Sequence, residues 1–100
     1  MGTGALDIDG AAVAVFCSRH GIRRLLVFGS AARGDLRPDS DVDILVEFKP
    51  GVAVGFHFIT MQEELSELLG RRVDLVTPGF LGPHIRRRVL EEAIPVYEAS

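Results

Sequence analysis

The sequence predicts a small α/β protein in which a mixed β-sheet of three or four strands packs its helices mainly on one face. Short apolar runs of strand length alternate along the chain with longer segments whose apolar residues recur at helical spacing. At 100 residues, with 47% hydrophobic and 25% charged positions, the chain suits one ordinary core. We therefore expect a single domain over residues 1–100, with the element order α-β-β-α-β-α-β.

Three helices are expected over residues 9–20, 56–69 and 83–93. Asp9 can cap the first, and Gly21 and Gly70 can end the first and second in the left-handed conformation. The apolar face of the first helix is Val13, Phe16, Cys17 and His20, and that of the second is Phe58, Met61, Leu65, Leu68 and Leu69. Each set predicts a helix lying on the sheet.

Strands are expected over residues 24–28, 41–48 and 72–77, with a short last strand over residues 95–97. The first is broken by Gly29-Ser30, and the others are followed by Pro50-Gly51 and Pro78-Gly79. The apolar content of each run and these turn residues together predict strands rather than further helices.

Composition excludes several classes of protein. The net charge of −3 argues against a general nucleic-acid binder, so no stable nucleic-acid contact is expected. No apolar run approaches the length of a membrane span, and the first ten residues lack the basic start of a secretory leader. The one cysteine, Cys17, is expected to be a small buried residue. We therefore expect a cytoplasmic protein.

Three aspartates are the first candidate site residues. Asp41 and Asp43 lie two apart on an expected strand, so both carboxylates point to one face, about 6.5–7 Å apart along the strand. Asp74 lies in a separate strand between Val73 and Leu75, where propensity disfavours it. Such carboxylates could hold two divalent ions such as Mg²⁺, and without metal we expect raised pKa values within the cluster.

The turn after the first strand is the second candidate. Gly29 allows close approach to a phosphate, and Ser30 offers a hydroxyl. If residues 31–33 begin a helical turn, its N–H groups favour an anion, and Arg33 adds a charged fork. A phosphate cradle beside metal-binding carboxylates is typical of phosphoryl or nucleotidyl transfer.

Each feature also has a purely structural interpretation. Asp-x-Asp can be a capping feature, Gly-Ser can be a simple turn, and Asp74 can pair with Arg71 or Arg72. Arg86, Arg87 and Arg88 are interpreted as forming ion pairs with Glu91 and Glu92 on a solvated helix face, or alternatively as a surface for an acidic partner or RNA.

The order of these motifs resembles that of a known family. Gly29-Ser30, ten intervening residues and Asp41-Val42-Asp43 match the Gly-Ser-x10-Asp-x-Asp signature of the DNA polymerase β-like nucleotidyltransferase superfamily. Residues 28–35, 40–46 and 69–76 are similar to its minimal nucleotidyltransferase (MNT) branch, and the resemblance covers roughly residues 13–97.

The resemblance implies a nucleotidyltransferase fold and transfer of AMP from ATP to a tyrosine of a partner HEPN-type RNase toxin, which makes the chain an antitoxin. It further implies that Gly29 and Ser30 hold the ATP phosphates, with Arg33 nearby. Asp41, Asp43 and Asp74 would bind two Mg²⁺ ions, and Asp74 would help to deprotonate the attacking hydroxyl. A homodimer or a hetero-oligomer with the toxin is compatible with this.

Two other functions remain open from the sequence. The chain could be a non-catalytic antitoxin that neutralises its partner by forming a complex. It could also modify a small molecule, although a chain this short lacks a second domain to bind one. The three intact aspartates favour the enzyme over the binding module.

Overall fold

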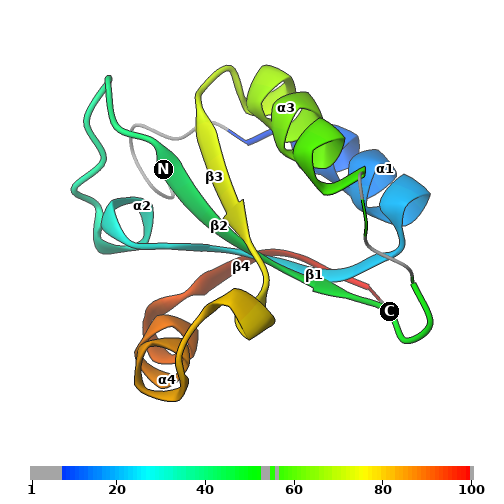
Figure 1. The fold of residues 1–100 in the computed structure, drawn as a ribbon. Helices are drawn as coiled ribbons and strands as arrows, with labels where there is room; N and C mark the ends of the chain where they lie inside the picture. The colour runs from blue at the N-terminus through cyan, green and yellow to red at the C-terminus, as the bar shows by residue number, and fades with distance from the viewer. Residues whose placement is uncertain (1–7, 53–54, 56, 100) are drawn as a thin grey trace.

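A four-stranded mixed sheet forms the centre of the computed structural model, which describes residues 8–52, 55 and 57–99 (Figure 1). The strand order is β3-β2-β1-β4. The strands are β1 (Ile22–Phe28), β2 (Val42–Phe48), β3 (Val73–Val76) and β4 (Ile94–Glu98). β1 pairs antiparallel with both β2 and β4, whereas β2 and β3 are parallel. The predicted fold class is confirmed.

The helices follow the predicted order with two additions. They are α1 (Gly10–His20), α2 (Ser30–Arg33), α3 (His57–Leu69) and α4 (Pro83–Glu92), with a 3-10 turn η1 (Pro78–Phe80) after β3. The predicted strand and helix boundaries are shifted by one or two residues. The predicted start of α3 at Phe56 lies outside the described residues.

The ends of α1 are set by the residues that the sequence indicated. The Asp9 carboxylate accepts hydrogen bonds from the N–H groups of Ala11 and Ala12, at 3.1 and 3.3 Å. Gly21 ends the helix with a φ of 68°, and its N–H bonds back to the carbonyls of the last turn. The cap fixes where α1 starts, and the glycine turns the chain directly into β1.

The core lies between the sheet and the helices α1 and α3, which cover the same face in Figure 1. Its buried side chains include Val13, Phe16 and Cys17 of α1, Met61 and Leu65 of α3, and Leu25, Val27, Val42, Ile44, Val46, Val73 and Leu75 of the sheet. The predicted apolar faces of both helices are therefore confirmed. His20, also predicted on that face, is only half-buried.

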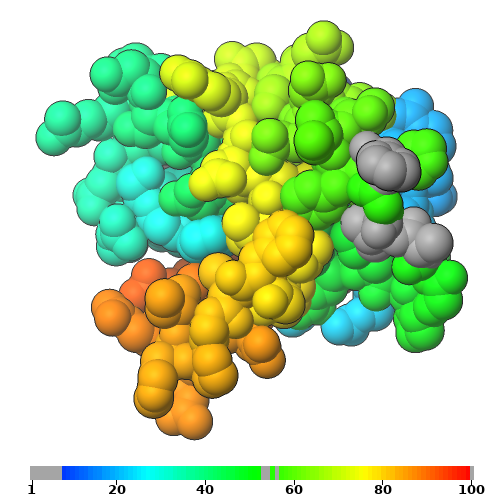
Figure 2. Space-filling model, viewed as in Figure 1, coloured from blue at the N-terminus to red at the C-terminus, as the bar shows by residue number. Residues whose placement is uncertain are grey.

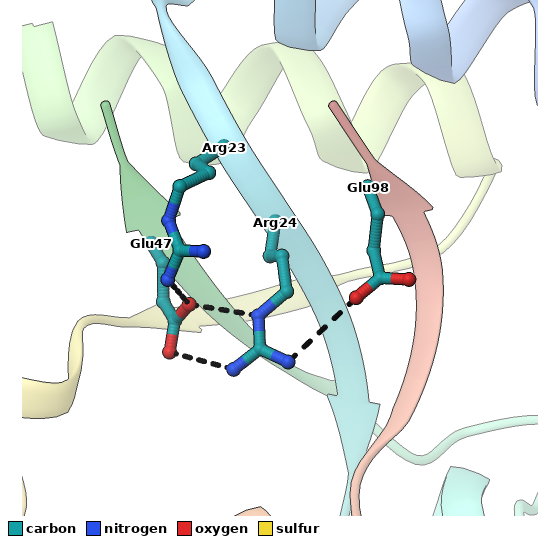
Figure 3. A network of polar contacts seen from close by, with 4 residues as sticks. All are labelled: Arg23, Arg24, Glu47 and Glu98. Atoms are coloured by element: carbon teal, nitrogen blue, oxygen red, sulfur yellow. Dashed lines mark hydrogen bonds and ion pairs between the residues drawn. The ribbon is translucent and has the colours of Figure 1, made fainter. Parts of the chain in front are cut away.

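Strand alternation leaves a different set of side chains on the second face. Because Val42, Ile44 and Val46 face the helices, Asp43 and Glu47 face the opposite side. Near the far end of this second face, Arg24 lies between Glu47 and Glu98 (Figure 3). Its Nε is 2.8 Å from Glu47 Oε1, and its Nη1 is 3.7 Å from Glu98 Oε2. This network links β2, β1 and β4.

Helix α4 departs from the predicted arrangement. It lies on the side of the sheet away from α1 and α3 (Figure 1), and none of its described side chains is buried. The prediction of helices on one face is correct for α1 and α3, which bury their apolar stripes, whereas α4 stays outside the core. The chain beyond β3 therefore adds a wall on the second face, across a hollow from Phe28, Gly29 and Arg33.

Candidate active site

Two of the three predicted aspartates are direct neighbours across the sheet. Asp43 of β2 and Asp74 of β3 are register partners in the parallel pair. Because residues level with each other in paired strands point to the same face, both carboxylates lie on the face opposite the helices. Asp41 comes just before β2 and is exposed. The predicted convergence of Asp43 and Asp74 is therefore found at one end of the sheet.

Gly29 lies against the Asp43 carboxylate. Phe28, the last residue of β1, pairs with Asp43, so the chain turns at Gly29 beside it. A Cβ atom at position 29 would lie 2.4 Å from Asp43 Oδ2, and the backbone φ there is 66°. Both space and backbone conformation therefore require glycine at this turn. The close approach brings the turn and the acidic site together.

The turn continues into α2, a single helical turn of four residues. Ser30 begins it, and its carbonyl accepts a hydrogen bond from the Asp35 N–H at 2.8 Å. Arg33 ends it, with Nε 3.5 Å from Asp35 Oδ2 and Nη1 3.7 Å from Glu92 Oε1 of α4. The Arg33 side chain is more than half exposed, so the guanidinium is accessible to an anion.

The electrostatics of the site centre on Asp43. Burial raises the pKa of this carboxyl above its ordinary value, and the negative charges of Asp74 and Asp41 raise it further, while Arg33 opposes them. The expected rise in pKa within the cluster is therefore confirmed at Asp43. A cation placed between these oxygens would relieve the repulsion.

Asp41 has a partner of its own in this conformation. Its Oδ1 is 3.2 Å from Arg72 Nε, and both side chains are largely exposed. Arg72, one of the two arginines considered as a partner of Asp74, pairs with Asp41 instead, and Arg71 donates to the carbonyls of Arg37 and Ser40. Across the described ranges, no three His, Cys, Asp or Glu side chains are gathered closely enough to hold a metal ion.

Sequence reasoning missed the contribution of α4. A hollow of about 180 Å³ opens between the β1–α2 turn and this helix. It is lined by Phe28, Gly29, Arg33, Ile85, Arg88, Val89 and Glu92. The spacing of the last four, which places them on one helix face, was readable in the sequence, but the position of that face beside Gly29 was not.

Comparison with known families identifies this arrangement. Residues 12–96 match the family model described as nucleotidyltransferase domain. The chain belongs to this nucleotidyltransferase family. The matched range includes Gly29, Asp43 and Asp74, so the predicted family resemblance is confirmed for the part of the chain that forms the site.

Individual nucleotidyltransferases are similar over most of their length. The protein adenylyltransferase MntA of Thermococcus cleftensis is 46% identical over 78 residues, which make up 78% of this chain and 78% of that protein. A solved structure of a minimal nucleotidyltransferase superposes with a TM-score of 0.74 at 46% identity, covering 86% of this chain and 87% of the other.

A more distant match shows the same fold. The crystal structure of a toxin–antitoxin complex with AMP-PNP matches with a TM-score of 0.75 at 17% identity, covering 93% of this chain and 76% of that one. At this identity the match establishes the nucleotidyltransferase fold alone. Separately, no helix within the described part of this chain is long and apolar enough to cross a bilayer.

Proposed function

We propose that this chain is a protein adenylyltransferase that transfers AMP from ATP to a hydroxyl group of a partner protein, a HEPN-type toxin, and so acts as an antitoxin. The observation that supports this most directly is the register pairing of Asp43 with Asp74 beside the close-packed Gly29 turn. Family membership and the name of the Thermococcus relative agree with nucleotidyl transfer to protein. The complex with AMP-PNP supports ATP as the donor.

The reaction exchanges one bond at the α-phosphorus of ATP for another. The acceptor oxygen forms a bond to the α-phosphorus of ATP, the bond from that phosphorus to the bridging oxygen breaks, and pyrophosphate leaves. In the proposed assignment Gly29 and Ser30 bind the phosphates, and Arg33 balances their negative charge. Asp74 takes the proton of the acceptor hydroxyl. The Asp43 carboxylate is the second carboxylate of the site and lies level with that of Asp74.

The donor set suits magnesium. Carboxylate oxygens are the ligands that Mg²⁺ prefers, and the raised pKa of Asp43 marks a cluster whose repulsion a divalent ion would remove. Asp43, Asp74 and Asp41 would hold it. For Asp41 this requires leaving Arg72, at low cost because exposed ion pairs contribute little. When bound, such ions stabilise negative charge on the attacking and leaving oxygens.

The exposed position of Asp41 and Asp74 suits an acceptor that is brought to the site by a partner protein. The hollow beside Gly29 is lined by none of Asp41, Asp43 and Asp74. Recognition of the acceptor is therefore assigned to the surface of the partner protein rather than to a deep pocket in this chain.

The test is transfer of label from α-labelled ATP to the HEPN-type partner in the presence of Mg²⁺. Label should appear on the partner with the wild type and be lost with Asp43→Asn and Asp74→Asn. Asp39→Asn is the matched control, because Asp39 is an exposed aspartate of the preceding loop. A stable complex that forms without any labelling would instead establish the non-catalytic antitoxin.

A further inference from the structure

The hollow beside Gly29 has one wall formed by α4. Ile85, Arg88, Val89 and Glu92 line it, and their spacing of three, four and seven residues places them on one helix face. Figure 2 shows α4 as an orange projection below the cyan surface of α2, with the molecular surface indented between them. The helix therefore faces the turn that abuts Asp43 without packing against it.

Arg88 is the residue of this wall whose charge has no partner among the described residues. The sequence suggested ion pairs between the three arginines of α4 and its glutamates, and this interpretation is wrong. Glu92 pairs with Arg33 instead, and Arg86 donates to the carbonyls of Pro78 and Leu81. Within residues 8–52, 55 and 57–99, Arg88 has no hydrogen bond or ion pair. An uncompensated guanidinium thus borders the hollow that Arg33 also lines.

We propose that Arg88 binds the β- and γ-phosphates of the nucleoside triphosphate, from the side of the hollow opposite Arg33. This inference depends on the proposed function, and it adds a binding residue from a helix that the motif does not include. A guanidinium presents its donors as a planar fork that matches phosphate oxygens. Gly29, in contact with Asp43, lines the same hollow, so an anion held there lies next to the carboxylate site.

Before nucleotide binds, the Glu92 carboxylate pairs with Arg33 in place of the phosphates. This carboxylate lies 3.7 Å from Arg33 Nη1, and both side chains are about half exposed. Pairs of this kind are weak, so a multiply charged phosphate displaces the carboxylate readily. The pair keeps Arg33 turned toward α4 and the hollow before nucleotide binds. Removing the Glu92 charge should therefore strengthen nucleotide binding, the opposite of removing the charge of Arg88.

An acidic segment of a partner protein could also bind two arginines, but the position of the hollow favours the nucleotide. Gly29 lines it close to the Asp43 carboxylate, and Gly29 is the residue to which the proposed function assigns the ATP phosphates. Arg87, which turns about 100° from Arg88 on the helix, is absent from the lining residues. A general docking surface would use both arginines, whereas a phosphate site uses only Arg88.

The experiment compares binding of AMP-PNP and AMP, each with Mg²⁺, by isothermal titration calorimetry to the wild type, Arg88→Gln, Arg87→Gln and Glu92→Gln. Arg88→Gln should raise the Kd of AMP-PNP about three- to tenfold and leave that of AMP unchanged. Arg87→Gln, the matched control, should change neither, and Glu92→Gln should lower the Kd of AMP-PNP. Unchanged melting curves would show that all variants fold.

Three results would overturn the inference. Arg88→Gln could behave like Arg87→Gln, it could weaken AMP as much as AMP-PNP, or it could weaken only binding of the partner protein, which would assign Arg88 to a protein contact. Failure of the proposed function looks different, because a wild type that binds neither nucleotide would contradict the nucleotide site itself. If the wild type binds AMP-PNP and Arg88→Gln binds it equally well, only the role of Arg88 is contradicted.

Discussion

Asp43 and Asp74 occupy the same level of two parallel strands, so their carboxylates share the face of the sheet that the helices leave open. Asp43 is half-buried and Asp74 is exposed. This unequal pair explains why burial is the main cause of the raised pKa of Asp43, with Asp74 next. The fold therefore maintains a carboxylate in a position that disfavours its charge, which is typical of a functional site.

Replacing Asp43 with Asn should separate function from stability. We expect AMP transfer to the partner to fall by at least about a hundredfold, because the site loses charge at the reacting phosphate. The free energy of unfolding at neutral pH should not fall, since the change removes a partly buried charge and its repulsion with Asp74. Labelling assays and urea titrations measure the two effects. A large loss of stability would contradict the assigned electrostatics.

The pKa of Asp43 also predicts the direction of a pH dependence. In the folded state this carboxyl binds its proton more tightly than in the unfolded state, where the pKa is about 3.8. Its contribution to the free energy of unfolding therefore falls as pH rises from the ordinary pKa through the raised one, and it is constant above. Urea titrations of wild type and Asp43→Asn across this window should show the wild type losing stability relative to the variant.

Gly29 and Gly34 provide a matched pair for the close approach at the site. Both have positive φ, at 66° and 79°, but a Cβ at position 34 meets nothing within 4 Å, whereas one at position 29 collides with Asp43. Gly34→Ala should cost about 1 kcal/mol of stability from backbone strain and leave transfer intact. Gly29→Ala should cost more and abolish transfer. Equal activity of the two variants would show that contact with Asp43 is unimportant.

Glu47 should stabilise the sheet in a pH-dependent way. Arg24 holds it with bonds of 2.8 and 3.0 Å, Arg23 adds one of 2.7 Å, and the pKa of Glu47 is lowered chiefly by the hydrogen bond from Arg24 (Figure 3). Glu47→Gln should lower the free energy of unfolding by about 1–2 kcal/mol at neutral pH. Because the folded pKa is the lower one, this stabilisation is complete above the ordinary pKa.

The same stabilisation should be lost as pH falls through the lowered pKa of Glu47, so wild type and Glu47→Gln should converge in acid. Glu67→Gln is the control, because Glu67 is exposed on α3 and has no ion pair within the described residues. Chemical denaturation over a pH series measures both. A difference between wild type and Glu47→Gln that persists undiminished in acid would contradict the ion-pair explanation.

Cys17 should report on opening of the core. It is fully buried, and burial raises the pKa of its thiol to about 12. Since only the exposed thiolate reacts, we expect a disulfide reagent to modify the native protein at least about a hundredfold more slowly than the urea-unfolded chain. Absorbance of the released reagent measures the rate, with Cys17→Ala as the blank. Rapid native labelling would show that α1 detaches easily from the sheet.

Much of this fold is determined by interactions between residues that are close together in the sequence. The Asp9 cap, the Gly21 terminus and the α3 stripe each depend on residues within a few positions of one another, so the sequence predicted them correctly. The Gly29 turn and the pairing of Asp43 with Asp74 were likewise predicted from spacing, and the structure shows both. The family resemblance that accompanied them is confirmed by the match over residues 12–96.

What the sequence could not predict depends on contacts between distant segments. The preference of Arg72 for Asp41 over Asp74 follows from how the loop before β2 meets the start of β3. The pairing of Glu92 with Arg33, rather than with its own helix, follows from the position of α4 beneath the β1–α2 turn. Helical spacing alone favours local ion pairs, so it misassigned the arginines of α4.

The parallel pairing of β2 and β3 has a consequence for the synthesis and folding of the protein. Antiparallel β1 and β2 can pair early, but β3 reaches β2 only after α3 has crossed the sheet. Asp43 and Asp74 therefore become neighbours only when this long-range pairing of β2 with β3 has formed. A growing chain on the ribosome that has reached β2 but not β3 carries Asp43 without Asp74, and so has no paired acidic site.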